Sequence, residues 1–145
     1  MPEDTLSLRP EDDPIGRAMQ WLEAIADRED WAPKARFGLT LSMDEALTNI
    51  LAYAFTPIGG TQGAPSIELT YANDGCELRV EIADNGHAFD PTSLDIGDAA
   101  LTLDEAEVGG HGLRLMRHYL KSFHYRREGA WNRLTLVLDS PAGLA

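Results

Sequence analysis

The segment 41–53 most constrains the fold, because its side chains divide into two opposed stripes at helical spacing. Residues four apart lie on the same side of an α-helix, so Glu45, Asn49 and Tyr53 form one polar row. The opposite side is apolar and consists of Met43, Leu47, Ile50 and Ala54. We therefore predict a helix that buries one side in a core and presents a carboxylate and an amide to a cleft.

A carboxylate and an amide oxygen at this spacing suit a magnesium nucleotide. Mg²⁺ binds hard oxygen ligands and takes few of them from protein when phosphate oxygens supply the rest, so Asn49 can be a metal ligand. Glu45 can orient or deprotonate an attacking hydroxyl group as a general base. The same pair also fits the solvated face of an ordinary amphipathic helix, and the helix alone does not separate these interpretations.

Two later segments contain turns that fit a nucleotide site. A strand-like run, 80–83, leads into Asp84-Asn85-Gly86, which is either a hairpin turn or a functional loop. The run 109–112, Gly-Gly-His-Gly, precedes a helical pattern. It is either a loop that approaches a ligand or a flexible linker before the helix. Glycines let the backbone approach a ligand closely, and a helix N-terminus offers free N–H groups to phosphate.

Periodicity along the chain predicts a single α+β domain over residues 1–145. The expected elements of the first half are a strand at 5–9, a helix from Pro14 capped by Asp12 or Asp13, and a helix over 33–55 with a candidate break at Gly38. Those of the second half are strands at 66–71 and 76–83, a helix over 112–122, and strands at 123–127 and 131–138. This order predicts a two-layer α/β sandwich, with three helices on one face of a mostly antiparallel sheet. Cys76, the single cysteine, is expected to be a buried strand residue.

Composition narrows the compartment and the partners. No apolar stretch is long enough to span a bilayer, and the acidic N-terminus lacks the blocks of a signal peptide, so we expect a cytoplasmic protein without membrane contact. The net charge is −12, with 24 acidic and 12 basic residues. Nucleic acids are bound mainly through Lys and Arg, so this balance argues against direct nucleic-acid binding.

The three segments, taken in this order, resemble the GHKL ATPase superfamily, whose members share the Bergerat nucleotide-binding fold. Glu45 to Asn49 resembles the N box, 84–86 the first glycine box and 109–112 the second. The likeness is closest to the anti-sigma-factor serine/threonine-protein kinases and covers nearly the whole chain. It rests on the phrases Glu-Ala-Leu-Thr-Asn, Asp-Asn-Gly-x-x-Phe-Asp-Pro, Gly-Gly-x-Gly-Leu-x-Leu-Met and Asn-Arg-Leu-Thr-Leu.

The resemblance implies a site for ATP and Mg²⁺. In the first two boxes it makes Asn49 the Mg²⁺ ligand, Glu45 the general base, Asp84 the acceptor for the adenine amino group and Gly86 a gap for the ring. Further along the chain it implies a nucleotide-binding group made of Gly109, Gly110, His111, Gly112, Leu113, Arg114 and Thr135. In this group Gly110 and Gly112 would present N–H groups to the phosphates, Gly109 would be a hinge, and Thr135 would reach the adenine edge.

Two positions depart from the family pattern. The expected ATP lid, residues 91–110, contains no Lys or Arg, whereas several relatives place a basic residue there on the terminal phosphate. Arg114 or His111 can substitute for it, and Arg114 can equally be a surface cation. Tyr53 stands where relatives often have His.

By resemblance, we expect a kinase that phosphorylates a small anti-sigma-factor antagonist protein and regulates a sigma factor by binding it. One alternative is a non-catalytic nucleotide-binding module that sequesters a partner, and another is a detached ATPase module of a different GHKL assembly. The P-loop, His-Glu-x-x-His and Gly-x-Ser-x-Gly patterns of other enzyme classes do not occur in the sequence. Homodimerisation stays open.

Overall fold

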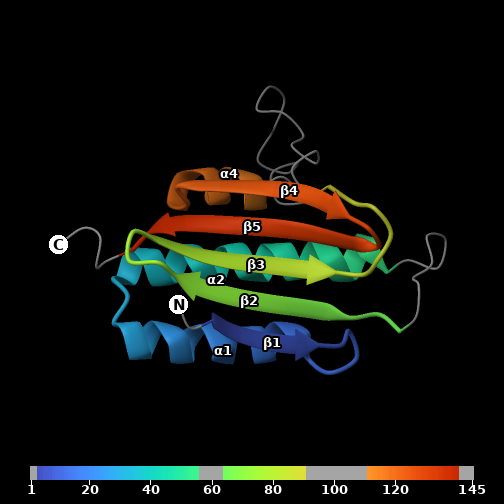
Figure 1. Cartoon of the computed structure of the whole chain (residues 1–145), viewed down its shortest axis with the longest axis horizontal. Helices are drawn as coiled ribbons and strands as arrows, with labels where there is room; N and C mark the ends of the chain where they lie inside the picture. The colour runs from blue at the N-terminus through green and yellow to red at the C-terminus, as the bar shows by residue number, and fades with distance from the viewer. Residues whose placement is uncertain (1–2, 56–63, 91–110, 141–145) are drawn as a thin grey trace.

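Five antiparallel strands form one sheet in the order β1-β2-β3-β5-β4 (Figure 1). The structure is a computed structural model that describes residues 3–55, 64–90 and 111–140, except the side chains of 111–113 and 115. Its elements are β1 (Glu3–Leu8), α1 (Pro14–Glu29), α2 (Pro33–Asn49), the π-helical turn η1 (Ile50–Ala54), β2 (Ile67–Asn73), β3 (Glu77–Asp84), α4 (His111–Tyr119), β4 (Ser122–Glu128) and β5 (Trp131–Asp139).

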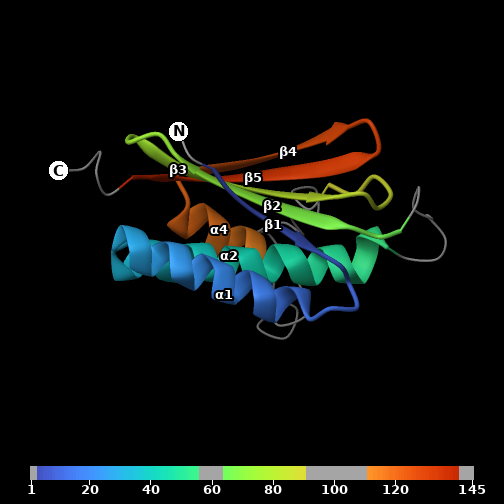
Figure 2. The ribbon, with the colours of Figure 1, turned by 60° about the horizontal axis from the view of Figure 1, so that its bottom comes forward.

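Helices α1, α2 and α4 cover one face of the sheet, as Figure 2 shows. The core lies between the two layers, because apolar residues alternate along the strands and recur every three or four residues along the helices. Its largest fully buried side chains include Leu22, Leu39, Met43, Leu47, Leu69, Tyr71, Ile82 and Leu136. The predicted α+β sandwich is confirmed, as is the burial of the apolar stripe of α2.

Helix α1 begins as its sequence predicts. Asp13 is the N-cap, its Oδ1 accepts from the Gly16 N–H at 3.3 Å, and Pro14 occupies the first turn, where its missing N–H costs nothing. The open choice between Asp12 and Asp13 is thus decided for Asp13.

The expected break at Gly38 is wrong, because α2 runs through this glycine without interruption. A Cβ at Gly38 would lie 2.7 Å from Cβ of Tyr119 on α4, so the glycine lets the two helices pack closely. The irregularity comes later, where α2 widens into the π-helical turn η1 directly after Asn49. π-Helical turns are rare in proteins, and many of those that occur lie at functional sites.

Cys76 is exposed, which corrects the expectation of a buried strand residue. It lies in the turn between β2 and β3, where the Asp74 carboxylate accepts from the N–H groups of Cys76 and Glu77, each at 2.8 Å. These bonds and Gly75, with a φ of 91°, delay the start of β3 to Glu77.

Helix α4 ends earlier than the sequence predicts. The Leu120 N–H still donates to the Met116 carbonyl at 2.8 Å, but the Lys121 N–H turns to the carbonyl of Val137 on β5 at 2.8 Å. Strand pairing thus replaces the last predicted helical turn, and β4 begins at Ser122.

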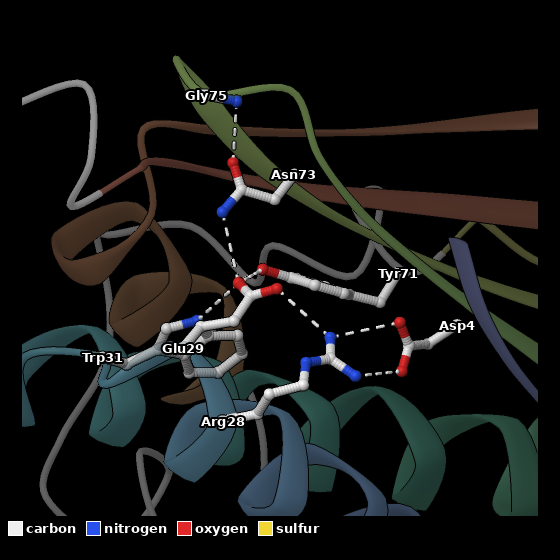
Figure 3. Close-up of polar contacts among 7 residues, drawn as sticks. All are labelled: Asp4, Arg28, Glu29, Trp31, Tyr71, Asn73 and Gly75. Atoms are coloured by element: carbon white, nitrogen blue, oxygen red, sulfur yellow. Dashed lines mark hydrogen bonds and ion pairs between the residues drawn. The ribbon is translucent and has the colours of Figure 1, made fainter. Parts of the chain in front are cut away.

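A polar network joins the end of α1 to β1 and β2 (Figure 3). The Glu29 carboxylate accepts from the hydroxyl of the buried Tyr71, from Asn73 at 3.2 Å and from Trp31 Nε1 at 3.4 Å. Arg28 donates to Glu29 at 3.1 Å and forms two hydrogen bonds with Asp4, at 2.8 and 3.2 Å. Burial alone would raise the pKa of Glu29, but these hydrogen bonds outweigh it and lower the pKa.

We expect Glu29→Gln to lower the free energy of unfolding at pH 7 by about 1–3 kcal/mol, because it places an amide donor opposite the Arg28 donor. The lowered folded pKa gives stability that is present above the unfolded value of about 4.3 and is lost as pH falls through the folded value. The variant should therefore lose less stability than the wild type on acidification. Urea unfolding of both proteins at pH 7 and pH 4 measures both effects. A variant with the same unfolding free energy as the wild type at each pH would contradict the account.

Within the described parts of the chain, no helix combines the length and apolar character needed to cross a membrane.

Candidate functional site

Residues from α2, η1 and three strands meet at one cavity under the sheet. It is lined by Ala46, Asn49, Ile50, Ile82, Asp84, Phe89, Tyr125, Asn132 and Leu134. Asn49 of the predicted polar row and Asp84 of the predicted loop therefore face the same space, although 35 positions separate them in the sequence. The cavity has a volume of about 20 Å³, enough for roughly one water molecule, so a larger ligand must displace side chains of the lining.

Asp84 is the buried carboxylate of this site, with 3% of its surface exposed. Strand register places it opposite Asn132 of β5, whose Nδ2 donates to Asp84 Oδ1 at 2.9 Å. The Gly86 N–H donates to the same oxygen at 2.9 Å. Desolvation by burial raises the pKa of Asp84, although these two bonds oppose the shift. Both bonds end on Oδ1, so Oδ2 is the oxygen that can accept from a ligand donor.

Asn132 is a site residue that the sequence reasoning missed. Its amide group donates to the His87 carbonyl at 2.9 Å as well as to Asp84. Its Oδ1 accepts from the Tyr125 hydroxyl at 2.6 Å and from the Phe89 N–H at 3.2 Å. Strand parity was the available signal, because Asn132 has the same parity as the apolar Leu134, Leu136 and Leu138.

The same parity corrects the expectation for Thr135. Its side chain lies on the open face of the sheet, in a shallow hollow shared with Thr70, Glu81 and Arg126, and not in the cavity with Asp84. Successive strand residues point to opposite faces of a sheet. Because Leu134 and Leu136 are buried beneath the sheet, Thr135 points away from the cavity that contains Asp84.

Gly86 has a structural reason for being glycine that differs from the expected gap for a ring. A Cβ at this position would clash with the carbonyl oxygen of Ala54, the last residue of η1. The neighbouring His87 N–H donates to that carbonyl at 3.0 Å. The glycine thus lets the loop after β3 dock against the end of η1, beside the cavity that Asp84 and Asn49 line.

We expect Gly86→Ala to lower the free energy of unfolding by about 1–3 kcal/mol, because the added methyl group overpacks a contact with rigid backbone. It should also weaken nucleotide binding by displacing the loop. Thermal unfolding with and without Mg-ATP measures both effects. A Gly86→Ala melting temperature equal to that of wild type would contradict the packing argument.

Glu45 and Tyr53 flank Asn49 on the polar row, one turn before and one turn after it. Glu45 is half-buried and lies outside the cavity lining. Tyr53 is 47% exposed, and its ring stacks on Phe89, with centroids 5.1 Å apart and planes at 20°. Since Phe89 lines the cavity, this aromatic pair covers the side of the site next to η1.

The second glycine box lies largely outside the described residues. Gly109 and Gly110 are not described, and His111, Gly112 and Leu113 are described only as the first turn of α4. The described part of α4 begins at His111, so Gly112 lies in its first turn. Arg114 is exposed on α4, and the expected lid, 91–110, falls outside the described residues.

Asn49 supplies the cavity with donor chemistry that suits the magnesium ion of a nucleotide. In the described ranges no three His, Cys, Asp or Glu side chains gather to hold a metal ion. Asn49 offers one amide oxygen at the cavity, which matches the few protein ligands that Mg²⁺ takes beside phosphates.

Comparison with known proteins shows the family of this chain. Residues 8–138 match the histidine kinase-like ATPase domain. The chain belongs to this family. It is also 46% identical, over 138 residues and 94% of both chains, to the serine/threonine-protein kinase BtrW of Bordetella bronchiseptica.

A solved structure supports the family fold. The crystal structure of the RsbU and RsbW domains of a Mycobacterium tuberculosis protein matches with a TM-score of 0.64 at 12% identity. The match covers 95% of this chain and 32% of that one, so this chain spans about a third of its length. At this identity the likeness concerns the fold alone.

Proposed function

We propose that this family member is an ATP-dependent serine/threonine protein kinase, working in the cytoplasm on a small anti-sigma-factor antagonist protein. The observation that carries the proposal is the meeting of Asn49 and the buried Asp84 at one cavity, with Glu45 one helical turn away. The high identity to BtrW, which is named a serine/threonine-protein kinase, favours protein phosphorylation over other ATPase reactions. Control of a sigma factor by binding is part of the same proposal.

The cavity supports an adenine site because its polar groups suit that base. Ile50, Ile82 and Leu134 give the lining apolar surface for a flat ring, and Asp84 Oδ2 can accept from the exocyclic amino group. A buried carboxylate without such a donor pays a desolvation cost, which matches the raised pKa of Asp84. The phosphates would then extend toward Asn49 and the N-terminus of α4, where free N–H groups favour anions.

Phosphoryl transfer asks mainly for positioning and charge neutralisation. Mg²⁺, when bound, neutralises phosphate charge, and Asn49 would hold it through its side-chain oxygen. Glu45 would accept the proton of the attacking serine or threonine hydroxyl. Glu45 is half-buried on the polar row and lies outside the cavity lining. This position suits a group that contacts the protein substrate and not the adenine ring.

A second candidate is a nucleotide-binding switch that sequesters a partner without phosphorylating it. The observation that favours it is the lack of Lys and Arg between Pro91 and Gly110, which removes a cation for the terminal phosphate. Both candidates require nucleotide binding, so they differ in the product formed.

Calorimetric titration of the protein with ADP and ATP, each with Mg²⁺, tests the nucleotide site. We expect saturable binding and a melting temperature that rises with ligand concentration, because a ligand of the folded state stabilises it by mass action. Absence of both binding heat and thermal shift at millimolar nucleotide would remove the kinase and the switch together.

A further inference from the structure

Arg127 of the edge strand β4 contacts the proposed base site from outside the cavity. Its Nη1 donates to the Gly86 carbonyl at 2.8 Å and to Asn132 Oδ1 at 3.2 Å, and its Nε donates to the Gly129 carbonyl at 3.1 Å. One guanidinium thus ties the loop after β3 to the β4–β5 turn. The rigid fork of Arg allows this, whereas a single ammonium group cannot reach three acceptors in these directions.

Strand register puts Arg127 in line with the residues that hold the base. Asp84 lies opposite Asn132, and Asn132 lies opposite Arg127 on its other side, so the three side chains form a row across β3, β5 and β4. Residues at paired positions share one face of a sheet. The row therefore runs from an exposed cation, through a buried amide, to the buried carboxylate that would meet adenine.

The contacts of Asn132 decide which way its amide points. Arg127, Tyr125 and the Phe89 N–H are donors and converge on Oδ1, so Nδ2 must face the acceptors Asp84 and His87 O. A reversed amide would oppose donor to donor and acceptor to acceptor, at the cost of several hydrogen bonds. With Nδ2 donating to it, the Asp84 carboxylate is held as an acceptor.

We propose that Arg127 is a positioning residue that makes the base site selective for a purine with an amino group at ring position 6. It acts through Asn132 and Gly86 and does not touch the base. The positive charge also favours the ionised form of Asp84, which lowers its pKa against the effect of burial. This inference rests on the proposed nucleotide site.

The test compares ADP with inosine diphosphate, which has a carbonyl acceptor in place of the amino donor, by calorimetry in the presence of Mg²⁺. For Arg127→Ala we expect ADP affinity to fall about tenfold while inosine diphosphate affinity hardly changes. The pH at which ADP binding weakens on the acid side should rise, because Asp84 loses a nearby cation. Phosphate titration of the ligand cancels when variants are compared with wild type.

Arg126→Ala is the matched control, because Arg126 is the adjacent residue on the opposite face and pairs there with Glu128 at 3.4 Å. It should keep the wild-type base preference and pH profile. Arg127→Lys keeps the positive charge, so ADP binding should weaken at the same acidic pH as in the wild type. It should still show a smaller preference for ADP over inosine diphosphate, and this measurement is the test if Arg127→Ala does not fold. A wild-type ratio of ADP affinity to inosine diphosphate affinity in either folded Arg127 variant would overturn the inference alone. No nucleotide binding by the wild type would overturn the proposed function together with it.

Discussion

Glu45→Ala should leave a folded protein that still binds Mg-ATP but transfers phosphate about 10²–10⁴-fold more slowly. This range is the usual contribution of a general base to the rate. Nucleotide binding should survive because Glu45 lies outside the cavity that would hold the adenine ring. Single-turnover transfer to the antagonist protein, followed by mass spectrometry, measures the rate. Calorimetry on the same samples measures nucleotide affinity separately.

Asp44→Ala is the matched control, since Asp44 is the adjacent carboxylate on α2 and is exposed. Its transfer rate should stay within about threefold of wild type, since a solvated surface charge contributes little. Asn49→Ala should differ from both by weakening Mg²⁺-dependent nucleotide binding as well as transfer. Equal transfer rates for Glu45→Ala and Asp44→Ala would remove Glu45 from the reaction.

Asp84→Asn should abolish most of the preference for adenine and weaken ATP binding by about 1–3 kcal/mol, roughly 5–150-fold. The asparagine oxygen can still accept from Gly86 and Asn132, which leaves its amide donor facing the amino donor of adenine. Titration calorimetry with ATP and an inosine nucleotide measures the loss.

The free energy of unfolding of Asp84→Asn should not fall along with its ATP affinity. The folded pKa of Asp84 is raised, so the stability linked to this group is present below its unfolded pKa and is lost as pH rises through the folded value. At pH 7 the buried carboxylate therefore costs stability, and Asp84→Asn should unfold no more easily than wild type. A folded variant with unchanged ATP affinity would exclude Asp84 from the site.

Local patterns in the sequence predicted the fold and the position of two residues that line the cavity. The stripes of α2 follow from helical spacing, and they place Asn49 correctly at the cavity while Met43 and Leu47 are buried. Asp84 is the last residue of the alternating strand β3 and has the parity of the buried Val80 and Ile82, so its side chain points under the sheet. These signals are local, so a sequence can display them.

The remaining site contacts depend on pairing between distant segments. Thr135 faces away from the cavity, contrary to what the family resemblance implies, because it alternates with the buried Leu134 and Leu136 along β5. The need for glycine at position 86 comes from the Ala54 carbonyl, and the role of Arg127 comes from the register of β4 on β5. Neither relation follows from neighbouring residues in the chain.

Incubation with Mg-ATP and the antagonist proteins of the same organism, read by mass spectrometry of the antagonists, tests the kinase proposal most directly. Wild type should add one phosphate to a serine or threonine of an antagonist, and Glu45→Ala should form the same complex with little product. A stable complex between the wild type and the antagonist, with nucleotide bound and no phosphoserine or phosphothreonine formed, would contradict the kinase and favour the binding switch.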